Sequence, residues 1–286
     1  MTAARLTVAF LGPGGTYTEE ALRASSGEEV SLQPRGTVYE TVMAVQEGET
    51  DRAVVPIENS LEGGVAATLD ALAGEAEDVR ICAEVVHPIR HHLMAGRELE
   101  LNEVERVLSH PQAMAQCARF LGERLPRAER IAATSTAEAV RRVSEGNEPW
   151  AALGSRLAAD LYGAQVLVEG VEDRADNLTR FVWLARAGRA PEAHGDGSKT
   201  SIVFWGFNDQ SPGALVSVLR ELSDRGINLT RIESRPRRVR LGHYMFFADL
   251  EGQDQEVVDE ALRALGERVE TLRVLGSYPV AEPREA

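Results

Sequence analysis

The stretch LTVAFLGPGGTYTEEAL, residues 6–22, reads as a strand, a glycine-rich turn and the start of a helix. Residues 6–11 form a short apolar run that ends at Gly12. Thr16, with Glu19 three residues later, is a capping-box pattern that predicts a helix start. Such a turn points free backbone N–H groups, at the positive end of the helix dipole, beyond the strand. The stretch therefore predicts an α/β fold with a candidate anion-binding turn, and a plain strand-to-helix turn is an equal alternative.

Two common nucleotide-binding loops do not fit this turn. Tyr17 stands where the pattern G-x-G-x-x-G requires its third glycine, so the turn is not a dinucleotide fingerprint. No lysine follows the glycines, so it is not a P-loop either.

The same unit recurs along the chain. A strand at residues 52–57 leads through Glu58, Asn59 and Ser60 into two glycines and a helix at residues 65–72. Because ligands of open α/β sheets gather at the carboxyl ends of the strands, the repeats favour a small-molecule cleft. Five helix starts are expected to converge on it, each contributing a few tenths to about 1 kcal/mol towards an anion. They lie near Thr16, Ser60, Ser109, Ser135 and Ser155.

A strand at residues 104–108 and the helix after it carry a second polar group. Ser109 and Gln112 form another capping box, and Gln116 lies one turn further on the same helix face. A solvated helix surface is the competing interpretation of Gln116. Strands at residues 131–134 and 150–153 precede two more helices, the second at residues 156–162.

Composition excludes several classes of function. The chain has 286 residues, a formal net charge of −14 and no basic stripe, so nucleic acid is not an expected partner. An anionic substrate must then be held by local groups rather than by a basic surface. Cys82 and Cys117 form no CxxC pair, and no run approaches the ~18 apolar residues of a membrane span. No signal-peptide pattern opens the sequence, and we expect a cytoplasmic protein with no membrane contact.

Three histidines occur within six residues of a strand predicted at residues 79–94. His87 and His91 share its apolar face, and His92 follows. Zinc needs three or four convergent ligands, and no Cys, Asp or Glu is spaced to help. The sequence therefore favours partly buried histidines in a sheet or hinge strand, with no metal.

The hexapeptide Asp176-Asn177-Leu178-Thr179-Arg180-Phe181 precedes the apolar run Val182-Trp183-Leu184. A hydroxyl, an amide and a guanidinium side by side suit recognition of a carboxylate or carbonyl, and a simple strand-entry turn is the alternative. Neighbouring strand residues face opposite sides, so Thr179 and Arg180 cannot both reach one cleft from regular strand. We therefore expect the turn to extend through Arg180 and the strand to start at about Phe181.

The last third of the sequence predicts a separate domain. Residues 187–198 are rich in Gly, Pro, His and Asp and are expected to form a linker. Strands are predicted at residues 200–207, 227–234, 243–250 and 272–278, and helices at 211–225 and 256–269. Pro212 is expected at the first helical position of the earlier helix, and Gly226 is expected to end it. The order βαββαβ is the ferredoxin-like arrangement.

Four motifs occur in the order and spacing of the prephenate dehydratase family, which the chain resembles from about Val8 to Leu184. They are Gly12-Pro13-x-Gly15-Thr16, Pro56-Ile57-Glu58-Asn59-Ser60, Ser109-His110-Pro111-Gln112 with Gln116, and Asn177-x-Thr179-Arg180-Phe181. Tyr17 replaces the phenylalanine expected from the family, which puts nothing catalytic in doubt. The C-terminal part is similar to the ACT regulatory domain.

The resemblance implies a two-lobed catalytic domain like that of periplasmic binding proteins, at residues 1–186, with the active site between the lobes. Lobe one is expected at about residues 1–78 and 166–186, and lobe two at about 79–165. The ACT domain is expected at residues 199–280. The chain is expected to lack the upstream chorismate mutase segment of bifunctional relatives.

The implied reaction converts prephenate into phenylpyruvate, carbon dioxide and water, in phenylalanine synthesis, without cofactor or metal. Thr179 is expected to help hydroxide leave, and Arg180 to pair with a substrate carboxylate. The catalytic set comprises Thr179, Arg180, Asn59, Ser109 and Gln116. The substrate-binding set comprises Gly15, Thr16, Glu58, Ser60, Ser135, Thr136 and Phe181.

The ACT resemblance implies phenylalanine as a feedback effector, bound between domains of a homodimer or homotetramer. The expected contacts are Gly213, Ala214, Leu215, Asn228, Leu229, Glu233, Ser234, Arg235 and Pro236. Helix packing and a hairpin turn are the structural alternatives for the two motifs. Two rival functions stay open: arogenate dehydration, and a non-catalytic amino-acid sensor.

Overall fold

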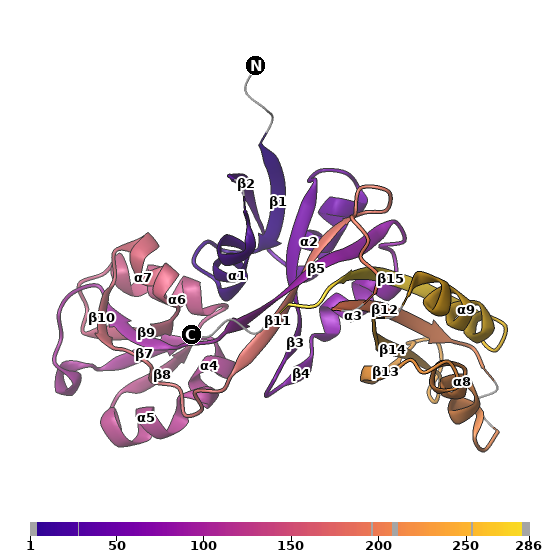
Figure 1. The fold of residues 1–286 in the computed structure, drawn as a ribbon. Coiled ribbons are helices and arrows are strands. Elements are labelled where there is room, and N and C mark those ends of the chain that lie inside the picture. The colour runs from indigo at the N-terminus through magenta and orange to yellow at the C-terminus, as the bar shows by residue number, and fades with distance from the viewer. Residues whose placement is uncertain (1–4, 28, 196, 208–210, 253, 282–286) are drawn as a thin grey trace.

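The computed structural model describes residues 5–27, 29–195, 197–207, 211–252 and 254–281. Its strands form three sheets that lie in a row, with the N-terminal sheet in the middle (Figure 1). The middle sheet has the order β2-β1-β3-β11-β5, with β4 paired to β3. Its strands are β1 (Leu6–Leu11), β2 (Val30–Arg35), β3 (Arg52–Asn59), β4 (Gly63–Gly64), β5 (Val79–Pro88) and β11 (Leu178–Arg186). The helices of this lobe are α1 (Tyr17–Ser25), α2 (Val38–Gln46) and α3 (Ala66–Ala73).

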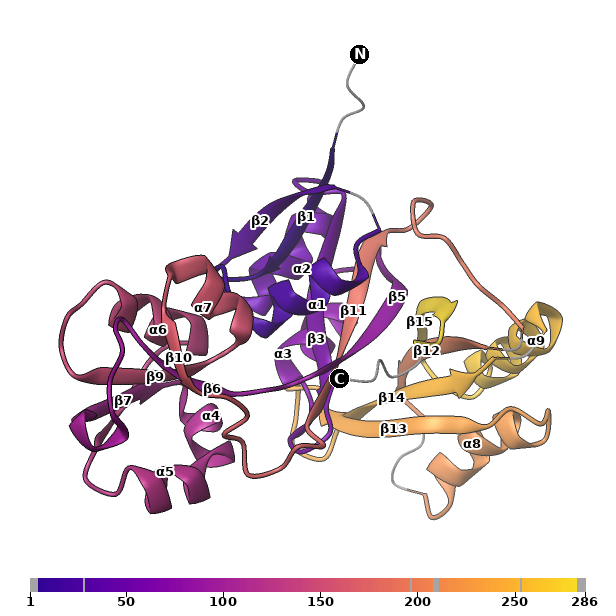
Figure 2. The ribbon, with the colours of Figure 1, turned by 60° about the vertical axis from the view of Figure 1, so that its left-hand side comes forward.

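The second lobe is built on a mixed sheet of order β10-β6-β9-β7-β8. Its strands are β6 (His92–Ala95), β7 (Arg106–Ser109), β8 (Glu129–Ala132), β9 (Trp150–Gly154) and β10 (Gln165–Val168). Its helices are η1 (Leu101–Glu103), α4 (Pro111–Gln116), α5 (Ala118–Arg124), α6 (Thr136–Ser144) and α7 (Arg156–Tyr162). The chain crosses between the lobes twice, after β5 and before β11 (Figure 2).

These crossings shift the predicted lobe boundaries. The strand β5 pairs with β11 in the first sheet, although residues 79–88 were expected in lobe two. The strand β10 pairs with β6 in the second sheet, although residues 166–168 were expected in lobe one. The single strand predicted at residues 79–94 is also wrong, because pairing with β11 ends at Pro88, which has no N–H to donate. The single helix predicted after residues 104–108 is also divided, into α4 and α5 at Cys117, whose backbone leaves the helical region.

The C-terminal sheet is antiparallel throughout, with the order β13-β14-β12-β15. Its elements are β12 (Ser198–Trp205), α8 (Ala214–Ser223), β13 (Leu229–Pro236), β14 (Tyr244–Glu251), α9 (Gln255–Gly266) and β15 (Thr271–Pro279). This is the predicted βαββαβ arrangement. The start of the first helix was placed too early, because α8 begins after Gly213, which caps it in the left-handed region at φ 81°. Pro212 therefore lies outside the helix, and α8 ends at Ser223 rather than Arg225.

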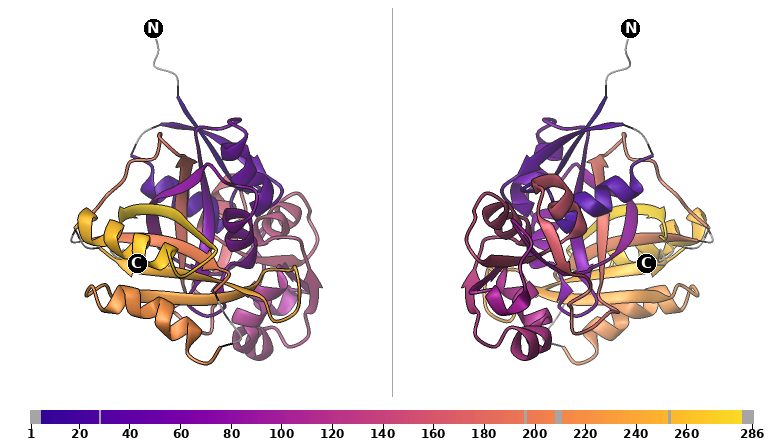
Figure 3. Two further views of the ribbon diagram at one scale, coloured as in Figure 1. Left: turned by 90° about the vertical axis from the view of Figure 1, so that its right-hand side faces the viewer. Right: turned by 90° about the vertical axis from the view of Figure 1, so that its left-hand side faces the viewer.

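The C-terminal sheet packs directly against the first lobe. In the left view of Figure 3 the C-terminal domain faces the viewer, with the two lobes behind it. Val203, Phe247 and Tyr278 share one buried core with Ala53 and Val182. The backbone of β15 approaches β5 so closely that a Cβ at Gly276 would lie 2.0 Å from the carbonyl oxygen of Ile81. The ACT-like domain therefore forms one wall of the catalytic lobe's core.

Candidate active site

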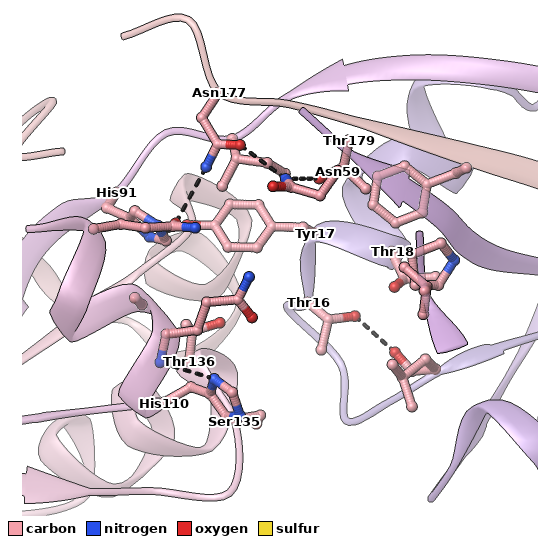
Figure 4. Close-up of a pocket in the computed structure, with 18 of the residues that line it drawn as sticks. Thr16, Tyr17, Thr18, Asn59, His91, His110, Ser135, Thr136, Asn177 and Thr179 are labelled. Carbon is pink, nitrogen blue, oxygen red and sulfur yellow. Dashed lines mark hydrogen bonds between the residues drawn. The ribbon is translucent and has the colours of Figure 1, made fainter. Parts of the chain in front are cut away.

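A cavity of about 340 Å³ lies between the two lobes. Figure 4 shows side chains pointing into it from both sides. The first lobe contributes Thr16, Tyr17, Thr18, Asn59, Thr179 and Phe181, and the second contributes His110, Gln112, Gln116, Ser135 and Thr136. The crossing segments add Ile89, His91 and Asn177. None of the described residues that line this cavity is Lys, Arg, Asp or Glu.

Thr179 is held by a neighbouring amide. It lies on β11 opposite Asn59 of β3, and Asn59 Nδ2 donates to Thr179 Oγ1 at 2.8 Å. Asn59 Oδ1 accepts from the backbone N–H groups of Leu61 and Glu62, at 3.0 and 3.1 Å. Because Thr179 Oγ1 is an acceptor in this bond, its own hydrogen is free to point into the cavity.

A second polar group surrounds Gln116. Its Oε1 accepts from Asn177 Nδ2 at 3.1 Å and lies 2.9 Å from His91 Nε2. The Tyr17 hydroxyl lies 2.7 Å from His91 Nδ1. Burial lowers the pKa of His91, so its imidazole is neutral near pH 7. Burial raises the pKa of Tyr17 well above its usual value, so its hydroxyl keeps its hydrogen.

Several helix N-termini reach the cavity, among them those of α1 and α6. Thr16 caps α1 by accepting from the Glu19 N–H, and Ser135 caps α6 by accepting from the Glu138 N–H. Both residues line the cavity, as does Thr136. The partial positive charge of these two termini faces the site, where it favours an anion.

Of the five residues named as helix starts, Ser109 and Ser60 do not cap a helix, and Ser155 caps one but lies outside the cavity lining. Ser109 is fully buried and donates to the Leu153 carbonyl, while His110 caps α4. The N-cap of α3 is Val65, and Ser60 instead accepts from the Leu178 N–H. Ser155 does cap α7, but its hydroxyl also donates to Gly15, away from the cavity lining.

Gly15 also lies behind the cavity wall. Its N–H donates to Glu19 Oε2 at 2.7 Å, so it is not free for substrate. Its φ is 83°, and a Cβ there would lie 3.0 Å from the Cα of Ala158. Glycine is needed because the turn packs tightly against α7 of the other lobe.

The prediction that the turn extends through Arg180 is wrong. The strand β11 begins at Leu178, and Thr179 and Arg180 are both in register with β3 and β5. Since neighbouring strand residues face opposite sides, Arg180 points away from Thr179 and away from the cavity. The structure therefore does not place Arg180 where it could pair with a substrate carboxylate.

Arg180 lies instead in a buried ion-pair network under the C-terminal sheet. Its guanidinium donates to Asp249 Oδ2 at 2.7 Å and to Glu84 Oε2 at 3.0 Å. Glu58 lies on the same face, 3.1 Å from Arg180, and does not line the cavity. Lys199 Nζ donates to Glu84 at 3.0 Å and completes the cluster.

The structure also adds site residues that the sequence analysis did not select. Asn177 lay within the quoted hexapeptide, and Tyr17 was seen only as a departure from a family pattern. His91 was considered as a metal ligand, yet no group of three His, Cys, Asp or Glu among the described residues could hold a metal ion. Its actual partners, Tyr17 and Gln116, are far away in sequence and gave no local signal.

The residues expected to bind an effector lie on the C-terminal sheet and on α8. Gly213 caps α8, Asn228 donates to Glu251, and Arg235 donates to Asp70 of the first lobe. Large exposed apolar side chains gather in this domain: Val216, Ile232, Val239, Leu241 and Tyr244. In the part of the chain that the structure describes, no helix has the length and apolar character needed to span a membrane.

Comparison with known proteins gives a consistent match over both domains. A family model described as prephenate dehydratase matches residues 8–189, and one described as ACT domain matches residues 200–267. The prephenate dehydratase of Mycolicibacterium gilvum is 39% identical, over 96% of this chain and 91% of the relative.

Two solved structures are also similar over nearly the whole length. Prephenate dehydratase from Arthrobacter aurescens in complex with L-Phe is 40% identical, with a TM-score of 0.89 over 98% of this chain and 92% of that one. GqqA, described as a novel type of quorum quenching acylase, is 32% identical, with a TM-score of 0.84 over 97% and 98%.

Proposed function

The chain belongs to the prephenate dehydratase family, and on that premise we propose that the cavity between its lobes is where prephenate reacts. The observation that carries this assignment is the pair Asn59 and Thr179, which presents a free hydroxyl hydrogen to the cavity. The family's substrate is a dianion, and neutral donors together with the N-termini of α1 and α6 are available to hold it.

The reaction is a decarboxylating 1,4-elimination. The bond from the ring to its carboxylate breaks and releases carbon dioxide, and its electron pair enters the ring. The C4–O bond breaks, and its electron pair leaves with the oxygen as hydroxide. The departing hydroxide becomes water by taking up a proton. Because the product ring is aromatic, the protein needs only to orient the substrate and stabilise the departing oxygen.

In this proposal Thr179 donates its hydrogen bond to the departing C4 oxygen. A threonine hydroxyl is a poor acid near neutral pH, so electrostatic stabilisation describes its role better than full proton transfer. Asn59 strengthens the effect, because donation to Thr179 Oγ1 polarises the hydroxyl towards the substrate. Gln116, Ser135 and Thr136 would hold the two carboxylates.

The test is Thr179→Ala, with kcat and KM for prephenate measured separately and Thr179→Ser as the matched control. We expect Thr179→Ala to lower kcat by about 10²–10³ and Thr179→Ser to recover much of it. A near-wild-type kcat in Thr179→Ala would rule out the catalytic role. An increase in KM alone would make Thr179 a binding residue.

Arogenate, which carries an ammonium where prephenate has a carbonyl, is the rival substrate. The described lining residues include no Asp or Glu to pair with an ammonium, which supports prephenate. Comparing kcat/KM for the two substrates decides between them. A non-catalytic sensor, by contrast, would bind prephenate without forming phenylpyruvate.

An acylase activity, as described for the structurally similar GqqA, has less support from the site. Acyl transfer uses a nucleophile paired with a base. Among the described residues that line the cavity, no Ser, Thr or Cys is hydrogen-bonded to a histidine or a carboxylate side chain.

Phenylalanine binding and oligomerisation belong to the same proposal. The relative from Arthrobacter aurescens is described in complex with L-Phe, and this chain has the same ACT domain. The strand β13 is an edge strand whose residue Ile232 is 48% exposed, and Val216 of α8 is exposed as well. Such an edge with apolar side chains suits pairing with a second copy, as a homodimer or within a homotetramer.

Calorimetry with phenylalanine on the intact protein tests the effector site. We expect binding together with a lower rate of prephenate turnover, and an absence of binding would contradict the proposal. A cytoplasmic location also remains a prediction from the sequence.

A further inference from the structure

The cavity wall contains a continuous series of hydrogen-bonded side chains. Figure 4 shows its links from Asn177 through Asn59 to Thr179. Each of its five contacts measures between 2.7 and 3.1 Å. One end is anchored by backbone N–H groups, which can only donate, so donors and acceptors can be assigned link by link. In order, the series comprises Tyr17, His91, Gln116, Asn177, Asn59 and Thr179.

The assignment starts at Asn59. Because Asn59 Oδ1 accepts two backbone N–H groups, its Nδ2 must be the atom that faces Asn177 Oδ1, at 2.8 Å. Asn177 Oδ1 is therefore an acceptor, and Asn177 Nδ2 donates to Gln116 Oε1. Gln116 thus holds its oxygen towards Asn177, and its amide hydrogens have no partner among the described residues.

The same oxygen determines the tautomer of His91. Gln116 Oε1 is an acceptor and lies 2.9 Å from His91 Nε2, so Nε2 must carry the hydrogen. A neutral imidazole has only one N–H, so Nδ1 is a bare acceptor. The Tyr17 hydroxyl is 2.7 Å from Nδ1 and 2.8 Å from the Arg90 carbonyl, so these two acceptors share its single hydrogen.

We propose that Tyr17 and His91 are positioning residues, which fix Gln116 so that its amide hydrogens, and not its oxygen, face a substrate carboxylate. With the opposite tautomer, His91 Nε2 would present a lone pair to Gln116, and the amide would be driven to turn over. Its oxygen would then face the substrate carboxylate and repel it. The described residues that line the cavity include no Lys or Arg that could hold the anion instead. The inference rests on the proposed active site and adds two residues to it.

The tautomer can be measured without any assay of activity. Long-range ¹H–¹⁵N spectra of the intact protein with ¹⁵N-labelled histidine distinguish a protonated from a bare ring nitrogen. The chain has six histidines, and His91→Gln identifies the signals of His91. We expect a hydrogen on Nε2 and none on Nδ1 at neutral pH, and a hydrogen on Nδ1 would overturn the proposal.

The kinetic test uses Tyr17→Phe, which keeps the ring and removes the donor to Nδ1. We expect kcat/KM for prephenate to fall by roughly tenfold, mainly through KM, because Gln116 contacts a carboxylate throughout the reaction. In a Gln116→Ala background the same substitution is expected to change little, because Tyr17 acts through Gln116.

Tyr162→Phe is the matched control. The Tyr162 hydroxyl donates to the Gly14 carbonyl at 2.7 Å, next to the same turn, but it is outside the series. The kcat/KM of Tyr162→Phe for prephenate is expected to stay close to that of the wild type. Equal effects of Tyr17→Phe with and without Gln116 would overturn the positioning role. If kcat of Thr179→Ala stayed near that of the wild type while His91 had the expected tautomer, the result would count against the proposed active site and not against the positioning role.

Discussion

Thr179 and Arg180 are neighbours on β11, and their side chains project from opposite faces of the first sheet. The Thr179 hydroxyl lines the cavity, and the Arg180 guanidinium donates to Asp249 of the C-terminal sheet at 2.7 Å. Both side chains are less than a tenth exposed. A single strand thus connects the proposed catalytic hydroxyl to the domain proposed to bind the effector.

The first prediction concerns the stability of this connection. In Arg180→Met, the carboxylates of Glu84 and Asp249 remain buried, with Lys199 and Arg231 as nearby cations. Breaking a buried ion pair by removing one partner typically costs about 3–5 kcal/mol, so we expect the free energy of unfolding to fall by that order. Urea denaturation measures it. Arg174→Met, which breaks only an exposed pair with Asp176, is the control and should change little.

The second prediction is the pH dependence of the same contact. Burial alone would raise the pKa of Asp249, but Arg180 and the hydrogen bond from Ser201 outweigh it and hold that pKa below its usual value. A carboxyl with a lowered pKa in the folded state adds stability above its unfolded pKa of about 3.9 and loses it as the pH falls through the folded pKa. As the pH is lowered from 5, the free energy of unfolding should therefore fall more steeply in the wild type than in Asp249→Asn. Parallel curves would mean that the pKa of Asp249 is the same in the folded and the unfolded protein.

The third prediction tests the amide that orients Thr179. Asn59→Asp keeps the shape and can still accept from the N–H groups of Leu61 and Glu62, but it cannot donate to Thr179. The hydroxyl would then turn its hydrogen to the new carboxylate, which also repels a dianion. We expect kcat/KM for prephenate to fall by at least about 10². An activity within a few fold of the wild type would show that Thr179 does not depend on Asn59.

Much of the fold could be predicted because its elements are marked locally. Thr16, Ser135 and Ser155 were named as helix starts from the sequence, and each caps a helix in the structure. The order of the C-terminal elements followed from alternating apolar patterns. The strand β2 was missed because Pro34 and its polar neighbours give no such pattern.

The site was less predictable for a physical reason. Motif membership does not say which face of a strand a residue occupies. Arg180 follows Thr179 in the motif, and strand geometry directs it to Asp249, a partner 69 residues away. Likewise, Ser109 has the sequence signature of a cap, but it is fully buried against Leu153 of β9.

The fourth prediction concerns self-association through the C-terminal domain. Ile232→Asp puts a charge on the exposed edge strand β13, where pairing would bury it without a partner. We expect the subunit dissociation constant to rise roughly 100-fold or more. Sedimentation velocity follows the shift from a multiple of 31.1 kDa towards the single chain. Leu161→Asp is the control, because Leu161 is equally exposed, at 50%, but lies on α7 of the catalytic domain. Dissociation by Leu161→Asp but not by Ile232→Asp would place the interface elsewhere.

The fifth prediction tests whether phenylalanine binding in the C-terminal domain affects the catalytic lobe through Glu233. A Cβ at Gly64 of β4 would lie 2.0 Å from Glu233 Oε2, which accepts from Arg231. In Gly64→Ala the carboxylate must therefore rotate away from Arg231, at little cost to stability because it is the end of a flexible side chain. Gly64 does not line the cavity, so we expect kcat without phenylalanine to stay close to that of the wild type. The phenylalanine concentration for half-inhibition should shift about tenfold or more, as expected from the loss of one charge-assisted hydrogen bond. Gly122→Ala on α5, where a Cβ meets open space, is the control and should leave the titration unchanged. An unaltered phenylalanine titration in Gly64→Ala would show that this contact takes no part in regulation.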